Sequence, residues 1–317
     1  MARGADRDTG RAPGPVHAGS PGPPRPVPTR GDPNLRPNRP SATAWRVALL
    51  RAAHQILDVP PVLADPVALA ILGPDERAAL EADPAAYERG RIGPYLRAFL
   101  AVRSRVAEDE LALAVARGVG QYVVLGAGLD TFALRHTHPG LRVFEVDHPD
   151  TQAWKRDLIA RAGLLPRGEL RFAPLDLGAA TLEGALAGAG FASDRPAFFS
   201  LLGVSMYLTR EALRATLAFA GGRPAGSAIV FDYALPRPGD EAGGLVFDAL
   251  AERVERAGEP WLTMLSPPEL ADEVRRAGLA LAQDLGAVEL NARYLAGRSD
   301  GLRVGRLARV AHARREG

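Results

Sequence analysis

Five residues that follow short apolar runs have the types and the spacing of a nucleoside-binding site. Gly126 and Gly128 follow the first run, where glycine would let the backbone turn sharply and let a ligand approach it closely. Asp147 follows the second run, and a carboxylate there can accept hydrogen bonds from both hydroxyls of a ribose. Asp176 and Leu177 follow the third, where a carboxylate and the next backbone N–H can bind an adenine ring. Together the three runs predict an adenosine clamp.

The residues after Gly128 distinguish between two classes of nucleotide ligand. A dinucleotide site has a third glycine in its G-x-G-x-x-G fingerprint, which allows a helix to pack closely beneath a pyrophosphate. Thr131 stands at that place here, and Asp130 would repel a phosphate group. The pattern therefore favours S-adenosylmethionine, a nucleoside with a cationic sulfonium and an amino-acid tail. The alternative enzyme class is an NAD-dependent oxidoreductase.

The candidate residues stand at the ends of predicted β-strands. Short runs rich in β-branched and aromatic residues alternate with helical patterns, which is typical of an α/β fold with a doubly wound, Rossmann-like sheet. We predict seven strands, mostly parallel with an antiparallel last strand, over residues 121–125, 142–146, 169–173, 197–202, 227–231, 279–285 and 305–313. The predicted helices between them cover residues 130–137, 150–162, 179–189, 209–221 and, in pieces, 243–277. Ligands bind such sheets at the carboxyl ends of the strands, which would bring the glycines and aspartates together.

The N-terminal part of the chain has a different character. Residues 1–40 contain ten of the 27 prolines and too little apolar surface to offset the entropy of ordering, so we expect a disordered tail. Residues 41–118 show helical spacing of apolar side chains, interrupted at Pro60 and Pro61. We expect a single domain over 41–317, in which 41–118 form a helical lid over the cofactor and 119–317 form the core.

Composition excludes several classes of function. The chain has no cysteine, which excludes disulfides and thiolate chemistry, and its six histidines form no metal-binding pair. The basic ends raise the net charge to +2, whereas residues 41–290 hold 25 basic against 32 acidic residues, so we expect no nucleic-acid partner. No apolar run is long enough to span a membrane, and no secretory signal is visible. We therefore expect a cytoplasmic enzyme that acts on a small molecule.

Several blocks of this sequence resemble the leucine carboxyl methyltransferase family and its bacterial relatives. The blocks follow one another in the family's order and extend from about residue 41 to the end of the chain. They are Val102–Val106, Tyr122–Arg135, Phe144–Pro149, Pro174–Leu177 and Phe198–Thr209. The resemblance implies an S-adenosylmethionine-dependent methyltransferase of the class I fold.

The resemblance also implies roles for single residues. Arg105 would hold the carboxylate of the methionine moiety, because a guanidinium pairs bidentately with carboxylates. Tyr207, after the fourth strand, would orient the methyl acceptor. The remaining cofactor-binding positions are Gly126 and Gly128 under the methionine moiety, Asp130 near its amino-acid end, Asp147 at the ribose, and Asp176 with Leu177 at the adenine.

Two features of the sequence bear on the reaction that we expect: one departure from the family pattern and the lack of a general base. In the branch that forms a methyl ester on leucine, a glutamate near the end of the fourth strand helps to hold the cofactor, and Leu202 stands there in this chain. A protein that binds the cofactor without catalysis is therefore an alternative. A carboxylate acceptor is ionised at pH 7 and needs no general base, and we find no convincing histidine base. We expect O-methylation of a carboxylate or an acidic hydroxyl, with Asp232 and Tyr233 after the fifth strand as further pocket candidates.

Overall fold

The computed structural model describes residues 41–317 except 89–92, 176–180 and 257. All the described residues belong to one compact unit. The predicted disordered tail, residues 1–40, lies outside the described residues. So do Asp176 and Leu177 and the start of the predicted helix 179–189.

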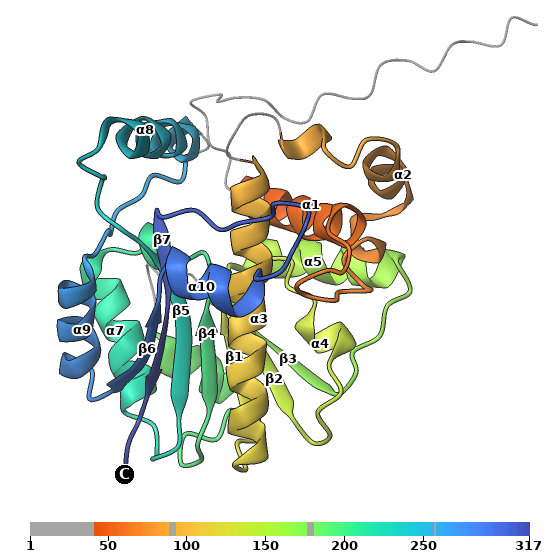
Figure 1. The fold of residues 1–317 in the computed structure, drawn as a ribbon. Coiled ribbons are helices and arrows are strands. Elements are labelled where there is room, and N and C mark those ends of the chain that lie inside the picture. The colour runs from red at the N-terminus through yellow and green to blue at the C-terminus, as the bar shows by residue number, and fades with distance from the viewer. Residues whose placement is uncertain (1–40, 89–92, 176–180, 257) are drawn as a thin grey trace, which may run out of the picture. The chain divides into compact units, whose positions relative to one another are not determined.

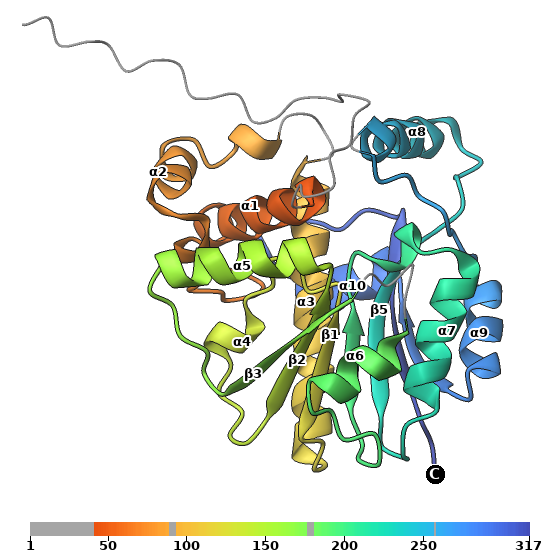
Figure 2. The ribbon, with the colours of Figure 1, turned by 180° about the vertical axis from the view of Figure 1, so that it is seen from behind.

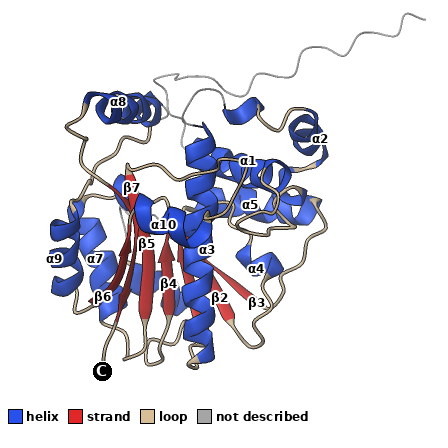
Figure 3. Ribbon diagram, viewed as in Figure 1, coloured by secondary structure: helices blue, strands red, loops and turns tan. Residues whose placement is uncertain are grey.

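A seven-stranded sheet forms the centre of the domain (Figures 1 and 3). Its strands are β1 (Gln121–Leu125), β2 (Arg142–Asp147), β3 (Glu169–Pro174), β4 (Phe198–Leu201), β5 (Ala228–Ala234), β6 (Ala280–Leu285) and β7 (Ala308–Arg314). The strand order is β3-β2-β1-β4-β5-β7-β6. The first five strands are parallel, and β7 runs antiparallel to both of its neighbours, β5 and β6. The predicted Rossmann-like sheet with an antiparallel last strand is confirmed.

Helices cover both faces of this sheet, which explains why the central strands are apolar along their whole length. Every residue of β1 and of β5 is buried. On the face seen in Figure 1 lie α3 (Gly93–Ala116) and α10 (Ala287–Tyr294). On the opposite face, seen in Figure 2, lie α6 (Leu182–Gly188), α7 (Arg210–Gly221) and α9 (Pro267–Arg276).

The remaining helices lie near the carboxyl ends of the strands or beside β3 (Figures 1 and 2). They are α1 (Ala42–Leu57), α2 (Pro74–Ala82), α4 (Phe132–Arg135), α5 (Pro149–Arg161) and α8 (Glu241–Arg256). Three short 3₁₀ turns complete the described elements: η1 (Ala70–Leu72), η2 (Ala86–Glu88) and η3 (Ser205–Tyr207).

The N-terminal helices do not all act as a cover. Ser41 caps the start of helix α1, because its hydroxyl accepts a hydrogen bond from the backbone N–H of Ala44 at 3.1 Å. It packs against α3 and lies beside the loop after β1, because a Cβ added at Gly128 would be 3.3 Å from the Cβ of Ala44. Helix α3 instead contacts β4 and β5 and places Val102 and Val106 in the main core. The covering role of residues 41–118 over the cofactor stays a prediction.

The sheet register brings the predicted loops to one edge. Leu125, the last residue of β1, pairs with Val146 of β2 on one side and with Leu201 of β4 on the other. The chain runs outward from β1 to β2 and β3 and then returns to form β4, so the strand order reverses between β1 and β4. This switch point is where open α/β sheets bind their ligands.

Candidate cofactor site at the strand ends

The loop after β1 has a conformation that only glycine adopts easily. Gly126 has a φ of +67°, and a Cβ added to it would lie 2.3 Å from Cγ2 of Val204. The backbone N–H groups of Gly126 and Ala127 both donate to the carbonyl of Val146, at 2.8 and 3.1 Å. The loop therefore turns back over the end of β2 and leaves no room for a side chain at its first residue.

Asp147 binds this loop directly. Its Oδ2 accepts a hydrogen bond from the backbone N–H of Gly128 at 2.5 Å, and its Oδ1 accepts one from the N–H of His148 at 2.7 Å. Burial raises the pKa of Asp147, and the two backbone hydrogen bonds oppose that rise. A carboxylate has about four acceptor positions, so two bonds leave capacity for ribose hydroxyls. The structure thus brings Gly128 and Asp147 together, and the ribose-binding role stays a prediction.

Asp130 is engaged by its own loop and by α1. Its Oδ1 accepts from the N–H of Phe132 at 2.8 Å, and its Oδ2 lies 3.1 Å from Nη1 of Arg51. Burial alone would raise the pKa of Asp130, but the positive charge of Arg51 and, more weakly, that of Lys155 lower it overall. Asp130 is therefore an ionised side chain that fastens the glycine loop to the N-terminal helix.

A cluster of four polar residues, Thr131, Asp65, Arg135 and Glu108, connects the glycine loop to the N-terminal segments. Thr131, which replaces the dinucleotide glycine, donates its hydroxyl hydrogen to the carboxylate of Asp65. Arg135 lies 3.5 Å from Asp65 and forms a two-pronged pair with Glu108 of α3. The side chain of Asp65 is fully buried. The cluster joins the glycine loop to α1, to α3 and to the segment between α1 and η1.

The structure does not bring Arg105 to this edge. Its Nε donates to Asp109, one helical turn further along α3, at 2.8 Å, and its Nη1 donates to the carbonyl of Val62 at 3.2 Å. The side chain is 47% exposed. The structure therefore does not bring Arg105 together with Gly128 and Asp147, and its role at the cofactor carboxylate stays a prediction.

Arg103, two residues before Arg105 on α3, lies at the strand ends instead. Residues two apart on a helix point about 200° apart around its axis, so the two arginines face opposite ways. The Arg103 side chain is 8% exposed, and its Nη1 donates to Oδ2 of Asp232 at 2.8 Å. The signal that identifies it is helical spacing, because Arg103 lies four residues after Phe99 and three before Val106, both of which are buried.

The Arg103 guanidinium lies against the turn that follows β4. A Cβ added at Gly203, where φ is +75°, would lie 2.7 Å from Nη2 of Arg103. The backbone N–H of Gly203 donates to Oδ1 of Asp232 at 2.5 Å. Asp232 is therefore a fully buried carboxylate that joins β5, the β4 turn and α3.

Tyr207 lies in η3, four residues beyond Gly203. Its backbone N–H donates to the carbonyl of Val204 at 2.9 Å. Burial raises the pKa of Tyr207, and a hydrogen bond with Trp261 opposes the rise. The hydroxyl of Ser205, in the same turn, donates to the carbonyl of Asp232 at 2.5 Å, so η3 lies beside β5. The contact of Tyr207 with an acceptor stays a prediction.

The remaining predicted site positions are Leu202, after β4, and Asp176 and Leu177, after β3. Leu202 is partly buried and packs against the main core, so it offers the cofactor no polar contact. Asp176 and Leu177 lie outside the described residues. The segment that leads to them leaves the sheet beside Asp147, because the N–H of Leu175 donates to the carbonyl of Asp147 at 2.8 Å. Their assignment to adenine remains a prediction.

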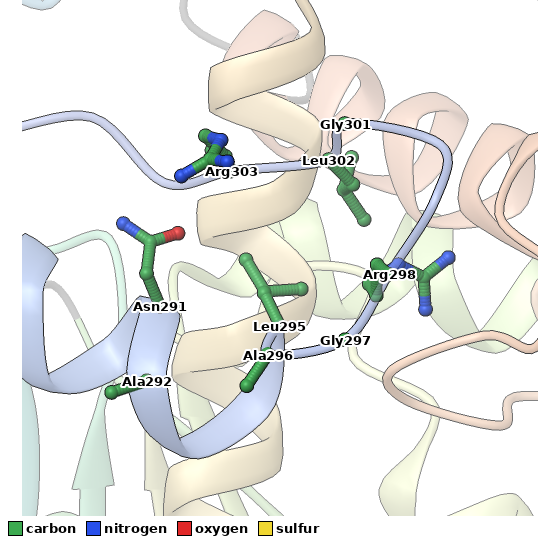
Figure 4. A pocket seen from close by; sticks show the side chains of 9 residues that line it. All are labelled: Asn291, Ala292, Leu295, Ala296, Gly297, Arg298, Gly301, Leu302 and Arg303. Carbon is green, nitrogen blue, oxygen red and sulfur yellow. The ribbon is translucent and has the colours of Figure 1, made fainter.

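Two hollows lie away from the strand ends, beside α10. One of about 260 Å³ is lined by α10 and the following loop, including Arg298 and Leu302 (Figure 4). The other, of about 450 Å³, includes Arg105 and Arg298 in its wall. These two arginines are paired with Asp109 and Asp300, which leaves little free charge for a ligand. The chemistry-bearing residues converge at the strand ends and not in these hollows.

Comparison with known proteins agrees with this fold. The leucine carboxyl methyltransferase family matches residues 44–221, more than half of the chain. YktD of Bacillus subtilis strain 168, named as a candidate S-adenosyl-L-methionine-dependent methyltransferase, is 36% identical over 221 residues, which cover 66% of this chain and 68% of that protein. A Frankia alni protein of the same description is 35% identical over 188 residues, covering 57% of this chain and 63% of the relative.

A solved structure extends the likeness to almost the whole fold. The crystal structure of a candidate methyltransferase from Thermobifida fusca YX superposes with a TM-score of 0.55 at 20% identity, covering 90% of this chain and 98% of that one. At that identity the likeness concerns the fold alone. The family match and the Bacillus relative together establish that the chain belongs to the leucine carboxyl methyltransferase family.

Among the described residues, no helix has the length and apolar character needed to cross a membrane.

Proposed function

We propose that this protein is an S-adenosylmethionine-dependent methyltransferase that transfers a methyl group to a carboxylate or acidic hydroxyl oxygen of a small molecule. The observation that carries the proposal is the convergence of the glycine loop, Asp147 and Arg103 at the switch point between β1 and β4. Family membership and the names of the relatives support this cofactor class.

The residues at the strand ends fit such a cofactor. The Nε atom of Arg103 is buried and has no hydrogen-bond partner, so this guanidinium keeps a donor for a ligand carboxylate. Gly126 has no room for a Cβ beside Val204, so the glycine loop lies close to the turn that follows β4. We assign the methionine moiety to Arg103 and the glycine loop, the ribose to Asp147, and the adenine to Asp176 and Leu177.

S-adenosylmethionine, when bound, supplies an electrophilic methyl group on a good, neutral leaving group. The chain's own residues then have to align the acceptor oxygen with that methyl group and exclude water. Tyr207 can orient the acceptor, because its hydroxyl is partly buried beside the strand ends. No general base is required if the acceptor is ionised, and His148, the nearest histidine in sequence to Asp147, caps α5 through Asp150 and is half exposed.

An acceptor screen tests the proposed reaction. The protein would be incubated with methyl-labelled S-adenosylmethionine and with matched sets of carboxylic acids, phenols, amines and the amides of the same acids. We expect label to enter the acids or the more acidic phenols. Methyl esters release methanol in mild base and methyl ethers do not, so base treatment separates the two oxygen products. Label that enters only amines would contradict O-methylation.

A further inference from the structure

Residues 259–263, called the strap here, connect two elements that both border the glycine loop. At one end, Glu259 accepts a hydrogen bond from the hydroxyl of Ser41, the N-cap of α1, at 3.0 Å. At the other end, the backbone N–H of Leu262 donates to the carbonyl of Met206 in η3 at 2.7 Å. The strap therefore joins α1, at the start of the described chain, to η3, which follows β4.

Both elements that the strap joins lie against the glycine loop. Ala44, in the first turn of α1, has its Cβ 3.3 Å from the position that a Cβ would take at Gly128. Cγ2 of Val204, which precedes η3, would be 2.3 Å from a Cβ at Gly126. The turn η3 also carries Tyr207, the residue expected to orient the acceptor. The strap is thus attached at both ends to elements that border the proposed cofactor and acceptor site.

The two attachments differ in how firmly they hold the strap. At η3, Thr263 is buried, its N–H donates to the carbonyl of Met206 at 3.1 Å, and its hydroxyl donates to the carbonyl of Leu208 at 2.7 Å. At α1, within the described residues, the hydrogen bond from Ser41 to Glu259 is the only one that joins the strap to this helix, and both residues are partly exposed. The end at α1 is therefore the one that can be released, because a single hydrogen bond in contact with water contributes little net stability.

Helix α8, which precedes the strap, is loosely packed as well. Of its 16 residues only Gly244 and Phe247 are buried. The ring of Phe247 packs edge-on against that of Trp261 in the strap, with 5.3 Å between the ring centroids. Figure 1 shows α8 beyond the carboxyl ends of the strands, where it covers neither face of the sheet. Segments with so few buried apolar contacts open at a low free-energy cost, so α8 and the strap can move as one unit.

We propose that the strap is a gate to the cofactor and acceptor site, and that the hydrogen bond between Ser41 and Glu259 is the latch that closes it. The inference rests on the proposed function, because the gate controls entry to the same site. When Glu259 releases Ser41, the strap moves away from α1, while its hydrogen bonds to η3 act as the hinge. The closed gate excludes water during methyl transfer, and its opening sets the rate at which S-adenosylhomocysteine leaves.

A covalent lock tests the gate. The chain has no cysteine, so Ser41→Cys, Glu259→Cys places the only two thiols at the latch. Dibromobimane links two neighbouring thiols and becomes fluorescent once both have reacted, which reports the lock. The variant would be loaded with labelled S-adenosylhomocysteine, crosslinked and then chased with an unlabelled excess. We expect label to leave about tenfold more slowly than from the same variant before crosslinking.

A matched pair of cysteines separates the lock from the chemistry of crosslinking. Asp272 and Arg275 are paired on α9, where their side chains are 49% and 74% exposed. Crosslinked Asp272→Cys, Arg275→Cys should release label at the rate of the same variant before crosslinking. Equal release before and after crosslinking at Ser41 and Glu259 would overturn the gate.

Charge substitutions test the latch without a crosslink. Ser41→Asp keeps the helix cap, because aspartate caps helices as well as serine does, and places a second negative charge against Glu259. Label should leave about fivefold faster than from the wild type, the effect of losing one hydrogen bond. Ser41→Asp, Glu259→Lys restores an attractive pair and should return the rate towards the wild-type value. A double variant that releases label as fast as Ser41→Asp would contradict the latch.

The outcomes distinguish the gate from the proposed function. If the wild type binds S-adenosylhomocysteine but neither the lock nor Ser41→Asp changes the release rate, the gate is overturned and the proposed function stands. A wild-type protein that does not bind S-adenosylhomocysteine would overturn the proposed function, and the gate with it.

Discussion

Arg103 and Arg105 show how a single helical position decides a functional assignment. Both belong to the short block that resembles the family, and both are arginines, so the motif alone does not choose between them. The two side chains differ in burial. Arg103 pairs with the fully buried Asp232, whereas Arg105 pairs with a carboxylate on the helix surface. Apolar spacing along α3 would have favoured Arg103.

Arg103→Lys should weaken binding of S-adenosylmethionine by about 1.5 kcal/mol or more, because lysine keeps the charge opposite Asp232 but loses the planar fork. Arg105→Lys is the matched control and should bind with wild-type affinity. Isothermal titration of the two variants checks this. A loss only in Arg105→Lys would return the role to Arg105, and equal losses in both variants would contradict a role that is specific to Arg103.

Asp147→Ala should weaken binding of the same cofactor by about 1.5–3 kcal/mol, the scale of a charge-assisted hydrogen bond. The substitution also removes the acceptor for the Gly128 N–H, so part of the loss comes from a looser glycine loop. Asp147→Asn separates the two effects, since it keeps an oxygen for the loop but not the charge. Wild-type affinity in both variants would remove Asp147 from the site.

At the scale of elements, β2 and α5 are joined by a fully buried ion pair. Lys155, the only lysine in the chain, lies 2.5 Å from Glu145, and both side chains are 1% exposed. Burial raises the pKa of Glu145 to about 7, although Lys155 opposes the rise. Oε1 of Glu145 has no hydrogen-bond partner among the described residues. The contact with Lys155 is therefore the one interaction there that stabilises the buried carboxylate.

Lys155→Met should therefore destabilise the domain by about 3–5 kcal/mol, because it leaves an acid buried alone. The double variant Lys155→Met, Glu145→Leu should recover most of the loss, since two apolar side chains of similar size need no partner. Urea unfolding followed by circular dichroism measures both. A double variant as unstable as the single one would show that the pair acts through packing and not through charge.

A second buried pair connects α3 to β7. Glu110 lies 3.1 Å from Nδ1 of His312, and its interaction with that histidine is the main cause that lowers the pKa of Glu110 to about 2. A carboxylate whose pKa is lower in the folded state stabilises the fold above its unfolded value of about 4.3. That contribution is lost as the pH falls from there towards 2.

Between pH 5 and pH 3 the wild type should consequently lose stability faster than Glu110→Gln, which has no charge to lose. Thermal unfolding at half-unit pH steps measures the two slopes. The Glu110→Gln protein should be less stable at pH 7, which serves as the internal control. Parallel slopes for the two proteins would exclude Glu110 as the titrating group.

At the scale of the whole molecule, most of the fold could be predicted from the sequence, because each strand is a short apolar run with clear ends. The predicted strands agree with the structure to within three residues, as in 305–313 against Ala308–Arg314. Helix α10 was missed, since only its N-cap, Gly286, separates its eight residues from β6, and Glu289 accepts the N–H of that glycine. Such a short helix leaves little periodicity to detect.

The candidate site could be predicted from the sequence only in part. Gly128 and Asp147 could be paired in advance, because both follow adjacent parallel strands. The partners of Asp130 and Thr131 could not, because Arg51 and Asp65 come from helices and loops far away in sequence. Asp232 was predicted as a pocket candidate, but its ion pair with Arg103 could not be predicted, since it depends on how α3 crosses the sheet.

The central claim is that the strand ends bind S-adenosylmethionine, and calorimetric titration of the purified protein with S-adenosylmethionine, S-adenosylhomocysteine and NAD in parallel tests it most directly. We predict that the first two bind at one site per chain and that NAD does not, because Thr131 and Asp130 oppose a pyrophosphate at the glycine loop. Binding of NAD alone, or of none of the three, would contradict the account.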